Sequence, residues 1–151
     1  MRLVREVLAF AALAFQIGMV GFLWSGLPDR IPKHYGITGT PDAFGGKSMV
    51  LLIPAITLGL YALLTIAGFF PQRLNYPVAV TDANREKLHG IAIALLGWLK
   101  AEMALLFLYI TWIDIQVGRG VSTGLGWACL PLALAVMGVT LGAGVAQMRR
   151  L

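Results

Sequence analysis

Residues 91–113 read IAIALLGWLKAEMALLFLYITWI, a nearly unbroken run of apolar side chains. Crossing the hydrocarbon core of a bilayer, roughly 30 Å thick, takes around 20 helical residues, so this stretch is long enough to span it. Backbone polar groups in lipid must bond within their own segment, which favours a helix over a strand. The stretch therefore predicts a transmembrane helix.

Three further apolar stretches of similar character lie at residues 7–24, 49–70 and 127–148. With flanking residues added, the predicted helices cover residues 7–27, 49–70, 89–113 and 125–148 of a single transmembrane domain, residues 1–151. The connections between them are short, so neighbouring helices are expected to run antiparallel. The predicted fold is all-α: a polytopic membrane protein built as a four-transmembrane-helix bundle, with an ordered extracytoplasmic loop at 28–48 and a cytoplasmic loop at 71–88.

The composition supports this interpretation. Of the 151 residues, 58% are hydrophobic and only 13% are charged, whereas soluble domains carry roughly 25% charged residues. A small domain leaves much of its surface in contact with solvent, and here that solvent must be lipid. The net charge is +5, but the basic residues flank the apolar runs, which indicates lipid headgroups as partners and not nucleic acid. The single cysteine, Cys129, excludes an intrachain disulfide.

The basic residues also predict the orientation in the membrane. One side would carry Arg2, Arg5, Arg73, Arg85, Lys87, Arg149 and Arg150, and the other Arg30, Lys33, Lys47 and Arg119. Because cytoplasmic loops are enriched in basic residues, the larger group predicts both termini in the cytoplasm. A signal peptide is the alternative for the first stretch, but no small-x-small cleavage site follows it, so we expect it to remain as a helix.

The connection between the first two helices reads LPDRIPKHYGITGTPDAFGGK over residues 27–47. Its prolines disfavour continued helix, and its glycines permit tight turns, so we expect an ordered, multiply turned loop. His34 is the residue here most able to titrate near neutral pH or to bind a metal. The alternative is that His34 donates to a loop carbonyl while Asp42 caps a turn or pairs with Lys47.

This loop carries a specific pattern: Leu27-Pro28-x-x-Ile31-Pro32-x-His34-Tyr35-Gly36-x-x-Gly39-x-Pro41-Asp42-x-Phe44-Gly45-Gly46-Lys47. It resembles the SdpI-like family of bacterial membrane proteins, and more narrowly the domain of unknown function 1648 that accompanies that family. The resemblance is densest over residues 13–55. It implies a bacterial inner-membrane protein. In the best-known member it also implies immunity against a secreted peptide toxin, coupled to sequestration of a regulator.

Two charged residues, Lys100 and Glu102, interrupt the third apolar stretch. Ionisable side chains at this depth are costly and generally face a bundle interior or a polar cavity. Residues two apart on a helix point about 200° apart, so the two cannot share a face or form a local ion pair. Lys100 can instead extend towards the cytoplasmic interface. Glu102 is expected to be protonated, bonded to another helix or exposed to a cavity, with four candidate partners: Gln16, Thr57, Tyr61 and Thr140.

A further polar group is predicted on the outer side of the membrane. Asp114 would lie just past the third helix, on the same side as His34 and Asp42. A small outer site built from these three, with Glu102 beneath it, is geometrically possible. His34 and Asp42 alone are not a metal site, because zinc takes three or four protein ligands. The candidate ligand-binding residues are His34, Asp42, Lys47, Lys100, Glu102 and Asp114.

No phosphate-binding loop, serine-nucleophile elbow, zinc-protease motif or paired cysteines occur, so a non-enzymatic role is favoured over an enzyme. Three functions remain open: an SdpI-like protein that binds a peptide or small ligand through its outer loop; a small transporter or accessory subunit that uses Glu102 and Lys100 in a polar cavity; and a membrane enzyme or metal site near His34. Small residues at Gly138 and Gly142 allow close helix packing, including a homodimer or another membrane protein as partner. The sequence identifies no cofactor.

Overall fold

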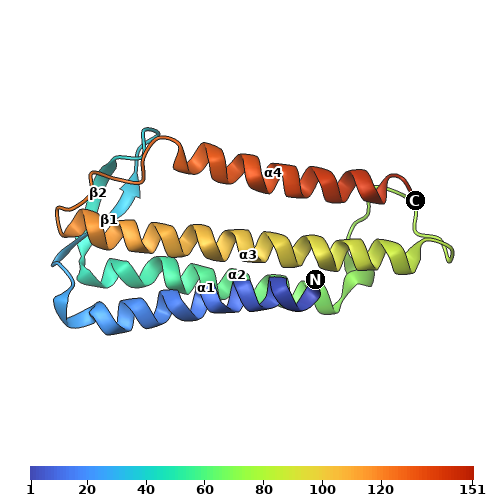
Figure 1. The fold of residues 1–151 in the computed structure, drawn as a ribbon, viewed down its shortest axis with the longest axis horizontal. Coiled ribbons are helices and arrows are strands. Elements are labelled where there is room, and N and C mark those ends of the chain that lie inside the picture. Colours follow the sequence, from blue (N-terminus) through green and yellow to red (C-terminus); the bar gives the residue numbers. More distant parts are fainter.

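The computed structural model describes residues 1–151 and contains four long helices with a β-hairpin at one end (Figure 1). Helix α1 covers Arg2–Leu23, α2 covers Leu52–Phe69, α3 covers Arg85–Gly118 and α4 covers Cys129–Met148. All four belong to segments long and apolar enough to cross a membrane. The prediction of an all-α fold with four such helices is confirmed.

α1 and α3 extend beyond the apolar stretches that predicted them, whereas α2 and α4 are a few residues shorter. α3 begins at Arg85 and ends at Gly118, against a prediction of 89–113, because its backbone remains helical after the side chains turn polar. α1 begins at Arg2 and is followed by a short 3₁₀ turn, Trp24–Gly26. Hydropathy marks the part of a helix that suits lipid and not the helix ends. Three acidic residues are affected: Glu6 falls inside α1, and Glu86 and Asp114 fall inside α3.

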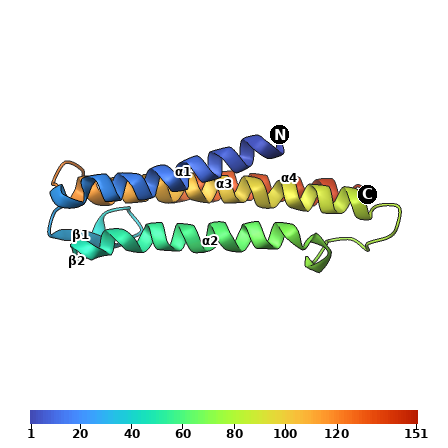
Figure 2. The ribbon, with the colours of Figure 1, turned by 90° about the horizontal axis from the view of Figure 1, so that it is seen from below.

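α3 is the central helix of the bundle. It packs against α1, α2 and α4, whereas α4 packs mainly on α3. In Figure 1, α3 runs between α4 on one side and α1 and α2 on the other; in Figure 2, α4 is largely hidden behind α3, and α2 runs below them. Both termini lie at the end opposite the hairpin (Figure 1). We call these two ends of the bundle the hairpin end and the terminal end.

Little of the chain is buried within the bundle. Only 26 of the 151 residues are buried, and some of the apolar ones form two clusters, one of five residues and one of three, at opposite ends of the bundle. The hairpin-end cluster contains Val20, Leu27, Ile31, Val50 and Ile115. Large apolar side chains are exposed all around the helices, which is expected where lipid replaces water as the solvent.

The ordered loop predicted after the first helix is a β-hairpin. Strand β1, Arg30–Tyr35, pairs antiparallel with strand β2, Pro41–Gly46, and the register is irregular around His34. The sequence did not indicate strands, because Pro32 and Pro41 lie within them. Proline is tolerated in a sheet only at edges, and in a two-stranded sheet both strands are edges. A 3₁₀ turn, Lys47–Leu51, then leads into α2.

Candidate functional site

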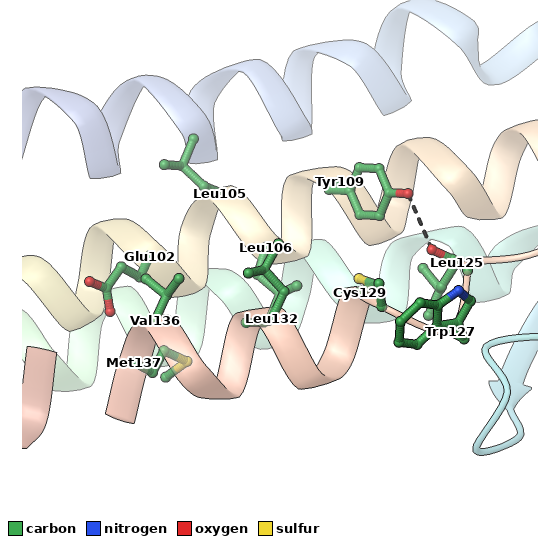
Figure 3. A pocket seen from close by; sticks show the side chains of 13 residues that line it. Glu102, Leu105, Leu106, Tyr109, Leu125, Trp127, Cys129, Leu132, Val136 and Met137 are labelled. Atoms are coloured by element: carbon green, nitrogen blue, oxygen red, sulfur yellow. Dashed lines mark hydrogen bonds between the residues drawn. The ribbon is translucent and has the colours of Figure 1, made fainter. Parts of the chain in front are cut away.

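Glu102 lies near the middle of α3 and faces α4 (Figure 3). Its Oε1 atom accepts a hydrogen bond of 2.5 Å from the Thr140 hydroxyl on α4. Its Oε2 atom is buried and has no hydrogen-bond partner. Thr140 was one of the four partners predicted for Glu102, so that prediction is confirmed. One carboxyl oxygen nevertheless remains unsatisfied at the centre of the bundle.

The other three predicted partners bond elsewhere. Gln16 is fully buried, and its Nε2 atom donates to the Phe107 carbonyl at 3.1 Å and to the Thr111 hydroxyl at 2.9 Å. Thr57 donates to the backbone of its own helix, and Tyr61 lies against Lys100. As partners of Glu102 these three predictions are wrong, because each side chain faces a different side of α3 from Glu102.

Two cavities between α3 and α4 meet at Glu102. The cavity towards the hairpin end has a volume of about 590 Å³, and the cavity towards the terminal end about 450 Å³. Leucine, valine, alanine and methionine side chains line most of the larger one (Figure 3). At its outer end the Tyr109 hydroxyl donates to the Leu125 carbonyl at 3.3 Å. We call the two cavities together the α3–α4 groove.

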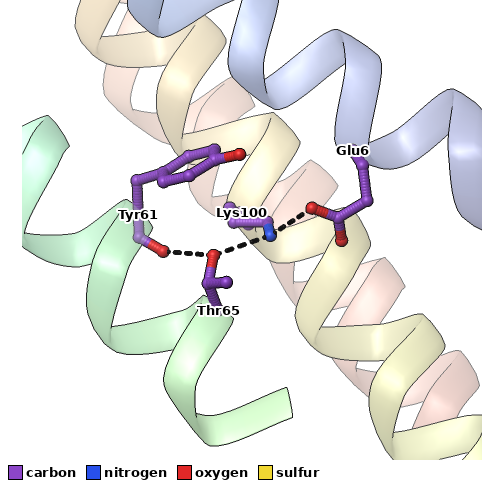
Figure 4. A network of polar contacts seen from close by, with 4 residues as sticks. All are labelled: Glu6, Tyr61, Thr65 and Lys100. Carbon is purple, nitrogen blue, oxygen red and sulfur yellow. Dashed lines mark hydrogen bonds and ion pairs between the residues drawn. The ribbon is translucent and has the colours of Figure 1, made fainter. Parts of the chain in front are cut away.

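Lys100 points away from this groove into the interface of α1, α2 and α3 (Figure 4). Its Nζ atom lies 2.6 Å from Glu6 Oε2 and 3.0 Å from the Thr65 hydroxyl. The ammonium also lies 4.7 Å from the centre of the Tyr61 ring, within cation–π range. Lys100 is only 4% exposed, so the predicted escape towards the interface does not leave it in solvent. Its charge is instead compensated inside the bundle.

Glu6 was not among the residues predicted to contact Lys100. The first helix was expected to begin at residue 7, which placed Glu6 outside the membrane span. The structure begins α1 at Arg2, so Glu6 lies in the second turn and reaches Lys100 across the helix interface. An acidic residue directly before an apolar stretch was the available signal. As predicted, Lys100 and Glu102 occupy different faces of α3 and do not pair with each other.

On the hairpin, His34 and Asp42 bond to each other. Their Nδ1 and Oδ1 atoms are 2.6 Å apart, and the two side chains are 68% and 53% exposed. The alternatives of a His34 bond to a carbonyl and an Asp42 pair with Lys47 are therefore wrong. The Lys47 ammonium lies 5.0 Å from the centre of the Trp24 ring instead. The strand register places His34 opposite Ala43, next to Asp42, and is irregular on both sides of His34.

Asp114 is separated from this pair. It is 4% exposed, and its Oδ1 atom accepts a 2.5 Å hydrogen bond from the Tyr35 hydroxyl. The strand pairing is irregular between His34 and Tyr35, and Tyr35 reaches α3 through this bond while His34 remains exposed. Burial raises the pKa of Tyr35 above its usual value, and the bond to Asp114 adds to the shift.

The predicted outer site of three residues is therefore not formed. His34 and Asp42 lie on the exposed side of the hairpin, and Asp114 lies under it. Glu102 is about 18 Å from Asp114 along the helix axis, at about 1.5 Å per residue, so it does not lie beneath that site. No three histidine, cysteine, aspartate or glutamate side chains come close enough together to hold a metal ion.

A second contact holds the tip of the hairpin. The backbone amide of Leu125, in the connection between α3 and α4, donates to the Gly39 carbonyl at 2.8 Å. Gly39 has a φ of 78°, which places it in the left-handed region that glycine adopts readily. Together with the Tyr35–Asp114 bond, this contact attaches the hairpin to both ends of the α3–α4 connection.

Comparison with known proteins adds a family likeness over part of the chain. Residues 9–58 match the family model described as Domain of unknown function (DUF1648). An uncharacterized protein of Archaeoglobus fulgidus is 29% identical over an alignment that covers 44% of this chain and 45% of the relative. The chain thus matches less than half the length of that relative. No solved structure matches the chain significantly. The segment similar to the DUF1648 family takes in most of α1, the whole hairpin and the first turns of α2.

Proposed function

We propose that this chain is a non-enzymatic integral membrane protein, resembling the SdpI-like immunity and signalling proteins, that binds a peptide or small ligand through the β1–β2 hairpin. The observation that carries the proposal is the exposed His34–Asp42 pair on a hairpin that is itself fixed to the bundle. The DUF1648 match supports it, since the matched segment is centred on the same hairpin. The hairpin would face the outside of the cell, as the distribution of basic residues predicts.

Rigid attachment favours binding. A recognition surface that is already ordered loses less conformational entropy when a ligand binds. Tyr35 and Gly39 hold the hairpin at two points, so the exposed side chains keep a defined spacing. The Asp42 carboxylate accepts hydrogen bonds, and the imidazole of His34 leaves its second ring nitrogen free for a ligand.

The edge of β2 favours an extended peptide over a compact ligand. β1 packs against α3 and pairs with β2 on its other side, so β2 has the freer edge. An unpaired strand edge presents backbone donors and acceptors to which an extended peptide adds as a further strand. Phe44 and Asp42 are exposed on this strand and would contact alternate side chains of such a peptide.

The other two functions have less support. A transporter that uses Lys100 and Glu102 together needs both in one polar cavity, but none of the larger cavities is lined by both. Lys100 is also already paired with Glu6. An enzyme or metal site near His34 would need a third ligand or catalytic group, and the nearest acidic residue of α3, Asp114, is bonded to Tyr35.

Protection of cells tests the proposal. A heterologous bacterium carrying the chain is challenged with the secreted peptide fraction of the source organism, and growth is compared with cells that carry the empty vector. We expect the chain to protect, and His34→Ala and Asp42→Asn to lose protection at equal membrane levels. The matched control is Asp82→Asn, which removes a carboxylate that is 94% exposed in the connection before α3.

The outcomes separate the alternatives. Protection that survives both hairpin substitutions overturns the hairpin as the binding surface. If Glu102→Gln loses protection while both hairpin variants keep it, the functional site lies in the bundle interior and not on the hairpin. Absence of protection by the unmodified chain, together with no binding of the peptide fraction to purified protein in nanodiscs, overturns the proposal as a whole.

A further inference from the structure

The α3–α4 groove consists of two cavities that the proposed hairpin function does not use. α4 rests mainly on α3, and the groove follows this single contact on both sides of Glu102. The hairpin-end cavity, at about 590 Å³, lies within the range of about 300–1,000 Å³ typical of small-molecule sites. Its walls are apolar apart from Glu102 at the inner end and the Tyr109 hydroxyl at the outer end.

Glu102 is incompletely satisfied in this groove. Thr140 bonds Oε1, and Oε2 is buried without a partner. A buried polar atom without a hydrogen bond destabilises the structure, and an ionised group without a partner destabilises it more than a neutral group does. No lysine, arginine or histidine lines either cavity, since Lys100 faces the opposite side of α3. With Glu102 ionised, the missing partner of Oε2 is a hydrogen-bond donor, and charge complementarity favours a cation.

We propose that the α3–α4 groove binds an amphiphilic amine, with its ammonium group on Glu102 Oε2 and its apolar body in the hairpin-end cavity. The cavity runs from Glu102 along α3 to Tyr109, about 10 Å at about 1.5 Å per residue. This length suits an alkyl chain or a small ring system attached to one amino group. Leu105, Leu132 and Val136 would contact the apolar body.

The depth of Glu102 in the membrane favours a free amphiphilic amine over a membrane lipid as the ligand. Glu102 lies near the middle of α3, far from both ends of the helix. The headgroup of an aminophospholipid stays at the bilayer surface, so its ammonium does not reach this depth. A free amine can enter sideways from the bilayer, because the groove is open between α3 and α4. This site is separate from the hairpin and does not depend on the function proposed for it.

Tryptophan quenching measures the binding. Trp127 lines the hairpin-end cavity and Trp98 the other, so a variant with Trp24 and Trp112 replaced by phenylalanine reports on the groove alone. The probe is ω-bromoundecylamine, whose bromine quenches tryptophan, added to protein in nanodiscs. The matched compound is ω-bromoundecanol, which partitions into the bilayer but carries no charge. We expect saturable quenching by the amine at a concentration roughly tenfold below that of the alcohol.

Variants assign the binding to Glu102. Glu102→Gln keeps the shape of the side chain and should weaken amine binding roughly ten- to a hundredfold while leaving the alcohol unchanged. Ala133→Phe fills the hairpin-end cavity and should remove binding of both compounds. Ala135→Phe, on an exposed side of α4 and outside the groove, is its matched control. Helix content and thermal unfolding are measured to confirm that each variant folds. If either Glu102→Gln or Ala133→Phe does not fold, the other variant still tests the proposal.

Four results would overturn the proposal. The first is equal quenching by the amine and the alcohol, which would mean that the groove only admits lipid chains. The second is amine binding that is unchanged in Glu102→Gln or in Ala133→Phe. The third is a dimer in detergent that Ala133→Phe dissociates, which would make the groove an interface with a second copy of the chain. Phosphatidylethanolamine that co-purifies with the unmodified chain, but not with Glu102→Gln, would also contradict a free amphiphile as the ligand.

Discussion

Lys100 on α3 and Glu6 on α1 form an ion pair across the helix interface, with Nζ 2.6 Å from Oε2. Lys100 is 4% exposed, whereas the Glu6 side chain is 39% exposed at the edge of a small cavity that also contains Arg2. The Thr65 hydroxyl on α2 accepts a second hydrogen bond from the ammonium. The Lys100 side chain thus connects α3 to α1 and α2 at a depth where an unpaired charge is strongly disfavoured.

The first prediction concerns this pair. Glu6→Gln leaves the Lys100 ammonium buried without its counter-charge. Removing one partner of a buried pair costs about 3–5 kcal/mol, and we expect about 3 kcal/mol because Glu6 is partly exposed. The measurement is unfolding of purified protein in mixed micelles by titration with a denaturing detergent.

The double variant Glu6→Gln/Lys100→Met is the control for this prediction. It removes both charges, so it should be more stable than Glu6→Gln alone. If the two single changes simply add in the double variant, the residues are not coupled and the ion pair does not stabilise the bundle.

The second prediction is an alkaline pH dependence caused by Tyr35. Burial and the hydrogen bond to Asp114 raise the pKa of Tyr35 above its value in the unfolded chain. The folded state therefore holds the Tyr35 proton more tightly. Its contribution to stability is complete below the usual tyrosine pKa of about 10 and is lost as the pH rises above it. Unfolding midpoints measured over the alkaline range should fall.

Tyr35→Phe tests the cause of this pH dependence. The variant has no hydroxyl to ionise, so the alkaline fall should be smaller than in the unmodified chain. At neutral pH it should be less stable by about 1–3 kcal/mol, because the buried Asp114 loses its donor. An unchanged alkaline profile would mean that other tyrosines cause the fall, and the Tyr35–Asp114 bond would then not be its source.

Hydropathy was sufficient to predict the four helices, because a membrane span must be both long and apolar. It could not predict how each helix is rotated. α3 carries apolar side chains on every face, its few polar residues lie on different faces, and lipid gives no hydrophobic force that selects one face. The partner of Lys100 was therefore missed, whereas Thr140 was found for Glu102 because few polar residues of α4 lie at that depth.

The hairpin end was harder to predict, because its contacts connect distant parts of the chain. Asp114 was expected at the membrane interface as part of an exposed site. It is buried because β1 places Tyr35 over it, and neither residue marks the other in the sequence. The pairing of His34 with Asp42 depends on the strand register, which the prolines of this segment concealed.

The third prediction concerns Gly39, where the tip of the hairpin meets the α3–α4 connection. A Cβ atom there would lie 2.5 Å from the Gly126 carbonyl oxygen, and the φ of 78° is unfavourable for other residues. Gly39→Ala should therefore separate the hairpin tip from this connection. We expect faster hydrogen exchange at the Leu125 amide, which donates to Gly39.

Gly46→Ala is the matched control for Gly39→Ala. Gly46 lies on the same hairpin, and a Cβ atom there meets nothing within 4 Å. Exchange at Leu125 should remain unchanged in this variant. Equal exchange in both variants would show that the hairpin tip does not protect Leu125.

The last prediction maps which polar residues water reaches. Single cysteines are placed at 34, 42, 100, 102 and 114 in a Cys129→Ala background, and intact cells are treated with a membrane-impermeant maleimide. We expect labelling at 34 and 42, because both side chains are more than half exposed on the hairpin. Positions 100 and 114 should stay unlabelled, since both residues are 4% exposed. Position 102 should also stay unlabelled, because the groove is apolar and maleimides react with the thiolate, which forms readily only in a polar environment.

Labelling at 102 in intact cells would reveal a water-filled path from the hairpin side to Glu102 and would restore the transporter interpretation. Labelling at 34 and 42 only after the cells are opened would place the hairpin in the cytoplasm and reverse the predicted orientation.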